Sequence, residues 1–569
     1  MKIKMKVKTL IILIIVFIVG FGFILPEIFL YGAGKIEDEK ALSLYGYYIN
    51  MPFAISKDKA LYKMAKSLVP YIGTYDLFMG ARGSRGGLVS QEDIDKALES
   101  YEEILDKYKN SPYYVRAYKE LLDIYIGRGQ VEKLKELIDW GRVSSNEGIV
   151  YTSQLYTAFN HMVNREYDEA MEIVEKYISE GVEDRRLYGL KGSIHFLQEE
   201  YPLAEKSFED ARTMPYIHDG GGNLFGSVGE VFDSYWLDSF LRRYKGDHTI
   251  RGRVTANGKP LPYAQIYIHS KSQYGSYSSR GEIYVALTDF NGEFETIGLK
   301  EGQYEIGVGV SQPLAYNLVF KERNEKVLEI NGDVTYNFEF TEPMELISPR
   351  GDFVLKESKF NLKWEKVEGA DYYKVFAVAF EEPLNISSSS ISYTIPNEEG
   401  DYEIRDNETR IDIDLVNFYP AGVFFSGDRR EKAYISPNGI LGTFYPGVRV
   451  PIIVKAFDKE GNLLNSSLPL ISNYEDISVV RVENRELTEG ERLILNREYE
   501  EAIEYYEGLL KEDSTNIEAL TYLSRIYADG WILGKDNLQK AKEYTERLYS
   551  ITGDDKVFIR LDHALEREK

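Results

Sequence analysis

The chain has 569 residues, which at roughly 150 residues per domain predicts about four domains. Hydrophobic residues make up 43% and charged residues 28%, a composition that excludes a disordered chain and one with many membrane spans. The formal net charge of −24 argues against nucleic-acid binding, which needs a basic surface. Cysteine is absent, and this excludes disulfides, thiolate nucleophiles and zinc ribbons.

Residues 1–34 predict a membrane anchor. Four lysines among the first eight residues precede an uncharged apolar run from Thr9 to Leu25. As a helix this run spans roughly 25 Å, and residues 26–31 complete a bilayer crossing. The lysines place the N-terminus in the cytoplasm and the bulk of the chain outside it. The alternative is a secretory signal cleaved near Gly34, but the apolar run is longer than a normal signal core, which favours the anchor.

Residues 35–246 are predicted to be helical, because apolar side chains recur at three- and four-residue spacing. Within them, similar residues repeat 34 positions apart, as in the pairs Ala158/Gly192, His161/His195, Tyr167/Tyr201, Ala170/Ala204 and Val174/Phe208. This pattern resembles the tetratricopeptide repeat, in which small residues stand where helices touch. Residues 483–569 carry further copies around Gly490, Ala502 and Tyr506. Because two copies alone bury little core, we expect them to pack on another domain or to dimerise.

The resemblance to the tetratricopeptide repeat implies a concave face that binds peptides. Transferred by register, the partner-binding positions are Thr152, Leu155, Phe159, Met162, Arg186, Ser193 and Phe196. Some family members grip a C-terminal carboxylate with Lys and Asn, but Leu155, Phe159, Gly189 and Ser193 occupy those positions here. A bound partner is therefore expected to present an apolar or aromatic segment. The alternative is that Phe159 and Met162 are buried under neighbouring helices.

Residues 249–341 show strand-like alternation and tight turns. Residues 252–254, 258–264, 288–294 and 298–306 together resemble the carboxypeptidase regulatory-like domain, a transthyretin-like β-sandwich that accompanies zinc carboxypeptidases without doing their chemistry. The only His-x-x-Glu, at His563 and Glu566, has no later histidine, so no zinc site is assigned there. Asp289 and Asn291 supply too few oxygens for calcium, and they predict a hairpin turn with Gly292.

Residues 342–482 predict a second β-sandwich. Trp364, the strand at 369–375 and the strand at 445–457 resemble parts of a fibronectin type III domain. The stretch at about 379–443 exceeds that family's spacing and predicts an insertion. Long loop insertions are common binding sites, but a decorative hairpin is the favoured alternative.

No enzyme signature is found in the sequence. Phosphate-binding and serine-nucleophile motifs are absent, and His161 and His195 are predicted to be hydrogen-bonded core residues. We assign no catalytic, cofactor-binding or metal-binding residue. A carboxylate-based glycosidase stays open from pairs such as Asp412 and Asp414.

The expected fold is multidomain α and β, with tetratricopeptide-like helical hairpins flanking two antiparallel β-sandwiches, after an N-terminal transmembrane helix. The expected function is a non-enzymatic, membrane-anchored extracytoplasmic scaffold that binds a protein or peptide through its repeats. The alternative is a cell-envelope carbohydrate-binding protein that uses the sandwiches, with the repeats as a spacer. Aromatic residues, at 13% of the chain, suit either kind of contact.

Overall fold

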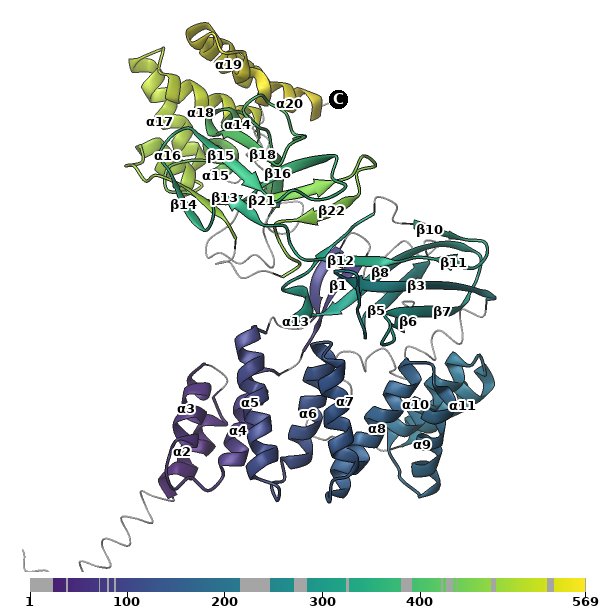
Figure 1. Cartoon of the computed structure of the whole chain (residues 1–569). Helices are drawn as coiled ribbons and strands as arrows, with labels where there is room; N and C mark the ends of the chain where they lie inside the picture. Colours follow the sequence, from purple (N-terminus) through teal and green to yellow (C-terminus); the bar gives the residue numbers. More distant parts are fainter. Residues whose placement is uncertain are drawn as a thin grey trace, which may run out of the picture. The chain divides into compact units, whose positions relative to one another are not determined.

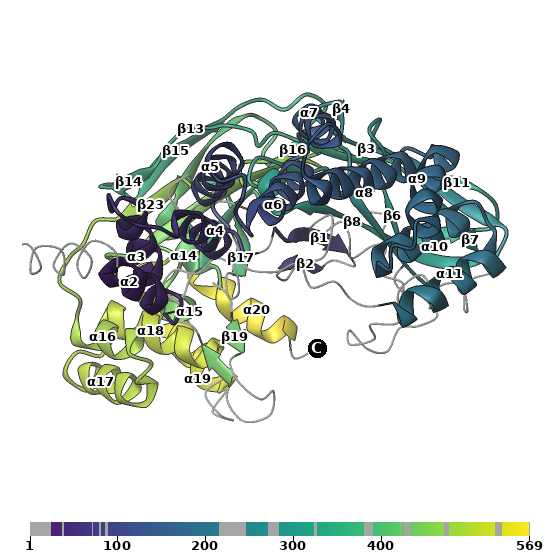
Figure 2. The same ribbon diagram turned by 90° about the horizontal axis from the view of Figure 1, so that it is seen from below.

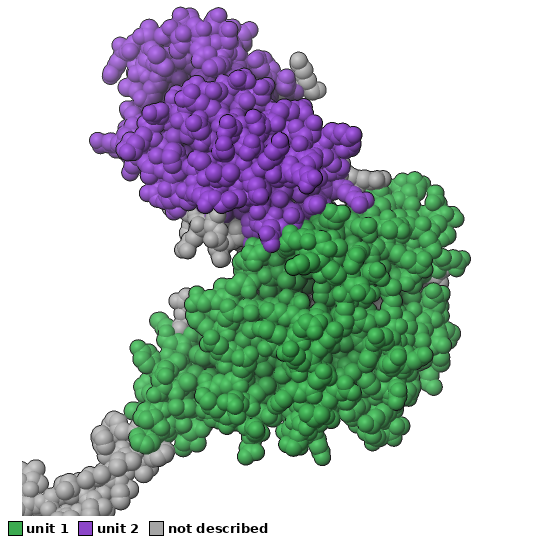
Figure 3. Space-filling view, viewed as in Figure 1, with its two compact units in different colours: residues 1–318, 325–340 green, residues 319–324, 341–569 purple. Residues whose placement is uncertain are grey.

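In the computed structural model, the chain forms two compact units (Figure 3). Unit 1 comprises residues 1–318 and 325–340, and unit 2 comprises residues 319–324 and 341–569. The structure describes residues 24–36, 39–70, 72–78, 81–85, 89–214, 246–270, 284–323, 327–379, 391–420, 423–425, 433–435, 437–471, 477–529 and 537–567. The predicted boundary between residues 35–246 and 249–341 thus falls inside unit 1.

Unit 1 begins with a row of helices that runs along one side of a β-sandwich (Figures 1 and 2). Side-chain caps begin several of the helices: Ser90 accepts from the Asp93 N–H and Asn146 from the Ile149 N–H. The helices are α2 (Leu25–Ala33), α3 (Glu39–Ile49), α4 (Lys57–Leu68), α5 (Gln91–Lys107), α6 (Tyr114–Gly127), α7 (Val131–Arg142), α8 (Glu147–Val163), α9 (Tyr167–Ser179), α10 (Arg185–Leu197) and α11 (Tyr201–Thr213).

Small residues let these helices approach closely, as predicted. Ala170 and Ala204 are fully buried. A Cβ on Gly192 would lie 2.5 Å from the Phe208 ring, and a Cβ on Gly141 would lie 2.0 Å from the Tyr118 hydroxyl. Glycine at these two places is therefore required by packing.

The predicted membrane segment lies mostly in residues 1–23, outside the described residues. Its last part, residues 25–33, forms α2, which packs on α3 through Leu30 and Ala33. No helix among the described residues is long and apolar enough to cross a membrane.

The sandwich of unit 1 has two sheets. One runs in the order β2-β1-β8-β5-β6, with β10 on β8, and the other has β3 between β11 and β12, with β4 and β7 also on β3. Their bounds are β1 (Thr74–Phe78), β2 (Ala81–Arg85), β3 (His248–Ala256), β4 (Lys259–Pro260), β5 (Gln265–Ser270), β6 (Tyr284–Leu287), β7 (Glu293–Leu299), β8 (Gly302–Ser311), β10 (Val327–Ile330), β11 (Val334–Thr335) and β12 (Phe338–Thr341). The short helix α13 (Gln312–Ala315) follows β8.

The predicted turn at Asp289 forms, but it does not close a hairpin. Asp289 Oδ1 accepts from the N–H groups of Asn291 at 2.9 Å and Glu293 at 2.8 Å, and Gly292 has φ +73°. However, β6 pairs with β5 whereas β7 pairs with β3 in the other sheet. The turn therefore connects the two sheets, because local turn chemistry does not decide which strands pair.

Unit 2 contains the second predicted sandwich. One sheet has the order β14-β23-β21-β16-β17 with β22 on β21, and the other has β15 between β13 and β18. Trp364 is fully buried between them, with its ring 5.2 Å from that of Tyr373. The bounds are β13 (Leu346–Ser348), β14 (Asp352–Leu355), β15 (Lys359–Trp364), β16 (Tyr372–Ala379), β17 (Ile391–Ile395), β18 (Glu408–Asp412), β21 (Arg449–Phe457), β22 (Leu463–Ser466) and β23 (Val479–Val482), with β19 (Val423–Phe425) and β20 (Ala433–Ile435) forming a separate pair.

The C-terminal helices of unit 2 pack on the described part of the insertion. Ile440 and Leu441 lie in one apolar cluster with buried side chains of these helices, such as Leu523 and Leu561. This cluster agrees with the expectation that residues 483–569 pack on another part of the chain. The helices are α14 (Ile413–Phe418) and α15 (Pro437–Leu441) from the insertion, and α16 (Glu489–Leu495), α17 (Tyr499–Glu512), α18 (Ile517–Ala528), α19 (Leu538–Thr552) and α20 (Ile559–Arg567).

Candidate functional site

The α8 part of the helix face predicted to bind a partner is buried, and Phe159 on it contacts the sandwich of the same unit. On α8, Leu155, Phe159 and Met162 are at most 1% exposed and Thr152 is also buried. The Phe159 ring stacks on Tyr263, with centroids 6.3 Å apart and planes 8° from parallel. The alternative prediction, burial of Phe159 and Met162, agrees with these positions.

Hydrogen bonds fix this contact, which we call the helix–sandwich seam (Phe159, Asn160, Asn164, Tyr263 and Phe290). The Tyr263 hydroxyl donates to Asn160 Oδ1 at 2.9 Å, and the Phe290 N–H donates to Asn164 Oδ1 at 3.1 Å. Tyr263 has φ +60°, an unfavourable backbone conformation for a bulky residue. The surrounding contacts hold that conformation, and burial raises the pKa of the Tyr263 hydroxyl.

The helices also add two strands to the sandwich. Residues 74–78, between α4 and α5, form β1, which pairs antiparallel with β8. The Tyr267 hydroxyl donates to Asp76 Oδ1 at 3.0 Å, and Gln91 Nε2 donates to the Pro313 carbonyl at 2.8 Å. The sequence pattern of the helical region gave no sign of these strands, since they are short and interrupt a helical run.

The predicted partner-binding positions on α10 are less completely buried than those on α8. Ser193 and Phe196 are buried, and Ser193 Oγ donates to the Gly189 carbonyl at 2.9 Å. The Arg186 side chain is 20% exposed and its Nε donates to both carboxylate oxygens of Asp184 at 2.9 and 2.8 Å. A Cβ on Gly189 would meet no atom within 4 Å. Among the predicted residues, therefore, only Arg186 offers exposed surface, and it lies three residues from an open position on the same helix.

His161 and His195 make the same contact in successive hairpins. Nδ1 of His161 contacts Glu166 Oε2, and Nδ1 of His195 lies 2.6 Å from Glu200 Oε2. Both rings are half-buried. They are hydrogen-bonded, as predicted, but they lie at the ends of α8 and α10 rather than in the core.

A buried charge cluster lies on α6, where the sequence suggested no site. Lys119 Nζ lies 2.8 Å from Asp123 Oδ2, and the Tyr156 hydroxyl donates to Asp123 Oδ1 at 2.5 Å. Burial raises the pKa of Asp123, and Lys119 opposes that rise. The i,i+4 spacing of Lys119 and Asp123 was the available signal. The charges are paired, so this arrangement is suited to holding α6 and α8 together.

In unit 2, two arginines bind backbone carbonyls of the insertion. Arg525 Nη1 donates to the carbonyls of Ile440 and Leu441 at 3.0 and 3.1 Å. Arg560 donates to three successive carbonyls, from Asn417 to Tyr419, at 3.0–3.2 Å, and it forms a 2.9 Å ion pair with Asp529. The described part of the insertion is thus a platform for the C-terminal helices.

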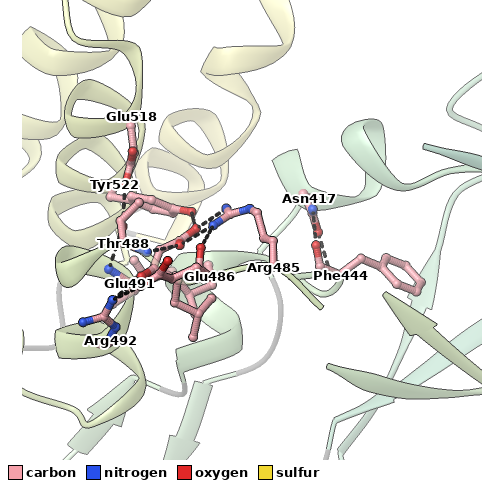
Figure 4. Close-up of polar contacts among 12 residues, drawn as sticks. Asn417, Phe444, Arg485, Glu486, Thr488, Glu491, Arg492, Glu518 and Tyr522 are labelled. Carbon is pink, nitrogen blue, oxygen red and sulfur yellow. Dashed lines mark hydrogen bonds and ion pairs between the residues drawn. The ribbon is translucent and has the colours of Figure 1, made fainter. Parts of the chain in front are cut away.

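A second polar cluster begins α16 (Figure 4). Arg485 binds Glu491 with two hydrogen bonds of 2.8 and 2.7 Å, Thr488 and Glu491 form a capping box, and the Tyr522 hydroxyl donates to Glu491 at 3.1 Å. Burial opposes ionisation of Glu491, but these donors outweigh it and hold the pKa of Glu491 below its ordinary value of 4.5. Asn417 and Phe444, in the same figure, exchange bonds of 2.8 and 2.9 Å. The described residues contain no group of three or more His, Cys, Asp or Glu side chains that could hold a metal ion.

Comparisons with known proteins find similarity to solved structures only. No family model and no curated protein matches the chain. A solved DUF3823 family protein from Parabacteroides merdae is 12% identical, with 42% of this chain and 99% of that chain covered and a TM-score of 0.14. The major pilin SpaD from Corynebacterium diphtheriae is 11% identical, with 42% and 66% covered and a TM-score of 0.16. The chain's fold is mixed α and β, with β-sandwich domains and several antiparallel sheets.

Proposed function

We propose that the protein is a non-enzymatic, membrane-anchored extracytoplasmic scaffold whose tetratricopeptide-like repeats bind a protein partner. In this proposal the two sandwiches, of carboxypeptidase regulatory-like and fibronectin type III-like kinds, brace the repeats. The observation that carries it is a turn that recurs in the helical hairpins of both units.

Four helical hairpins use the same turn. Each ends its first helix with a residue at φ between +62° and +65°, at Gly129, Arg165, Glu199 and Arg497. In each, the N–H of the next residue donates to a carbonyl five residues back, at 2.8–2.9 Å, as in a Schellman motif. Three of the four residues are not glycine, so the conformation is set by the hairpin rather than by local freedom. This recurrence supports a repeat array, the architecture that presents a continuous binding face.

The partner site in this proposal is the α10 end of the array. At α8 the chain's own Tyr263 supplies the aromatic group that the face was predicted to accept. At α10, Gly189 faces open space and Arg186 is partly exposed. A partner segment with an apolar side chain would match this surface, and a carboxylate on the partner would share the Arg186 guanidinium with Asp184.

Partner binding is tested by photo-crosslinking from the full chain in its membrane. A photoreactive residue at Gly189 should capture one protein, and Arg186→Glu should abolish that adduct. The matched control is Gly508 on α17, where a Cβ also meets no atom within 4 Å. Equal capture at positions 189 and 508, or capture unaffected by Arg186→Glu, would contradict the assignment to α10.

The location is tested separately with introduced cysteines, because the natural chain has none. Val143→Cys replaces a side chain that is 84% exposed. We expect a membrane-impermeant maleimide to label it in intact cells, and Lys4→Cys to react only after permeabilisation. The reverse pattern would refute an extracytoplasmic location.

A second candidate function is carbohydrate binding by unit 2. Tyr372 and Phe457, both half-buried, stack with centroids 5.3 Å apart and planes 13° from parallel, and Lys374 Nζ lies 5.4 Å from the Tyr372 ring. Aromatic rings beside polar groups are suited to sugar faces. Loss of envelope-glycan retention in Tyr372→Ala, with retention kept in Tyr549→Ala on α19, would favour this candidate over the scaffold.

A further inference from the structure

Exposed apolar side chains concentrate at the start of unit 1. Among the described residues, nine of the nineteen exposed large hydrophobic side chains lie between Ile24 and Ile55. That segment has only thirty described residues. Such a concentration exceeds the scattered exposure that is normal on a protein surface and marks an interaction site.

The exposed face of α2 is wholly apolar. Ile24, Ile28 and Tyr31 follow helical i, i+4, i+7 spacing and are 54%, 59% and 66% exposed, and Leu25 and Phe29 flank them. The opposite face packs into unit 1 through Leu30 and Ala33. One face of α2 is therefore packed against the protein, whereas none of the described chain covers the apolar face.

Hydrogen bonds join α2 to the neighbouring loop. The Tyr48 hydroxyl donates to Glu27 Oε1, Ser56 Oγ donates to Glu27 Oε2 at 3.0 Å, and the Ser56 N–H donates to Tyr48 at 2.9 Å. The one carboxylate of α2 is thus satisfied within the protein. The same bonds hold the residues next to Tyr47 and Ile55, which are 72% and 67% exposed. We call Ile24, Leu25, Ile28, Phe29, Tyr31, Tyr47, Phe53 and Ile55 the N-terminal apolar face.

Three observations favour lipid as the occupant of this face. The face continues in sequence directly from the uncharged run at residues 9–25, whose length lies at the lower end of the about 17–25 residues that span a bilayer. Tyr31 and Tyr47 are of the amphipathic type enriched at membrane interfaces, and Lys35 Nζ lies 4.7 Å from the Tyr31 ring centroid, as a snorkelling lysine would. A second copy is disfavoured, because each chain carries a formal charge of −24.

We propose that the N-terminal apolar face lies in the interfacial layer of the bilayer that anchors residues 9–25. This inference rests on the proposed membrane anchoring and adds a lipid-contacting surface to it. The first helices of the array then lie directly on the membrane and are not separated from it by a flexible linker. A helix that lies in this layer buries its apolar face about 5–10 Å into the boundary between headgroups and acyl chains.

The test uses the full chain in phosphatidylcholine vesicles that contain doxyl-labelled phosphatidylcholine. Single cysteines replace Ile28, Ile55 or, as the control in the same unit, Val143, and each carries an environment-sensitive fluorophore. We expect blue-shifted emission and loss of fluorescence to doxyl lipid at positions 28 and 55, and neither change at 143. Because all three positions are exposed, melting curves should match that of the cysteine-free chain. If the melting curve of the variant at position 28 or 55 does not match, Tyr47→Cys replaces that variant.

Flotation of the same samples separates the two proposals. If the chain floats with the vesicles but positions 28 and 55 behave like 143, this inference is overturned while anchoring stands. If the chain does not float, both are overturned. Self-quenching that grows with the protein-to-lipid ratio, without doxyl quenching, would assign the face to a second copy and overturn the lipid assignment.

Discussion

Two glycines three residues apart on α10 should respond oppositely to alanine. At Gly192, the new Cβ would lie 2.5, 2.6 and 2.9 Å from atoms of the buried Phe208 ring, so the ring or the helix must move by about 1 Å to restore ordinary contact. Such overpacking costs about 1–3 kcal/mol, partly offset by a helix-propensity gain of about 1 kcal/mol. At Gly189 no atom lies within 4 Å, so only the gain applies. The two variants should therefore differ by about 1–3 kcal/mol.

Native-state hydrogen exchange of the full chain measures this difference locally. Amides of α10 and α11 should exchange roughly five- to more than 100-fold faster in Gly192→Ala than in Gly189→Ala, since about 1.4 kcal/mol is tenfold. A matching pair exists in unit 2, where a Cβ on Gly490 would lie 2.2 Å from Tyr506 and one on Gly508 would meet nothing within 4 Å. Equal exchange in the Gly189 and Gly192 variants would refute the claim that close helix contact requires glycine at 192.

Three further predictions concern the polar contacts. Tyr263→Phe leaves Asn160 without its donor at the seam and should weaken α8 by about 1–3 kcal/mol, seen as faster exchange there while α18 is unchanged. Arg560→Met removes the ion pair of the buried Asp529 and the donor to three carbonyls, and should destabilise the C-terminal helices by about 3–5 kcal/mol, seen as their preferential proteolysis. Because the pKa of Glu491 is lowered on folding, its stabilisation is present above the unfolded pKa of about 4.5 and is lost as pH falls through the folded value, so acid unfolding of α16 should begin at less acidic pH in Arg485→Ala.

The controls for the first two changes lie in the same unit as each variant. Tyr31→Phe removes a hydroxyl from a ring that is 66% exposed, and it should leave exchange of α8 unchanged. Arg547→Met removes an arginine whose side chain is 35% exposed and should leave proteolysis of the C-terminal helices unchanged. Unchanged exchange of α8 in Tyr263→Phe, unchanged proteolysis in Arg560→Met or an unchanged acid limb in Arg485→Ala would contradict the corresponding contact.

The repeating features were predictable because they depend on local packing. The 34-residue offset between Ala170 and Ala204 reflects helices that touch at the same point in each hairpin, and both alanines are fully buried. The sandwich strands were predictable for a similar reason, since alternation places Phe360, Leu362 and Trp364 on one buried face. These signals survive in a single sequence because each depends on neighbours within one element or one hairpin.

What could not be predicted depends on contacts far apart in sequence. The pairing of β1 with β8 joins residues 74–77 to residues 308–311, and no short pattern encodes it. The turn at Asp289 was predicted correctly, but the sheet that receives each strand was not. The role of the insertion depends on Arg560, which lies 141–143 residues after the three carbonyls that it binds from Asn417 to Tyr419.

Tyr263 occupies the α8 face, so a binding site transferred from a family by sequence register has to be checked against the tertiary structure. Family register predicted that Phe159 lies on a face that accepts an apolar or aromatic group, and in the structure its ring stacks on Tyr263, 104 residues later in the chain. An internal occupant has no translational entropy to lose, so a free peptide competing for α8 would have to bind better than a tethered ring. Partner binding at α8 would therefore require opening of the seam. At α10, where Gly189 is open, no such displacement by the described residues is needed. A partner that binds the closed seam should consequently depend on Arg186 and be insensitive to Tyr263→Phe, whereas one that needs the open seam should bind more tightly when that hydroxyl is removed.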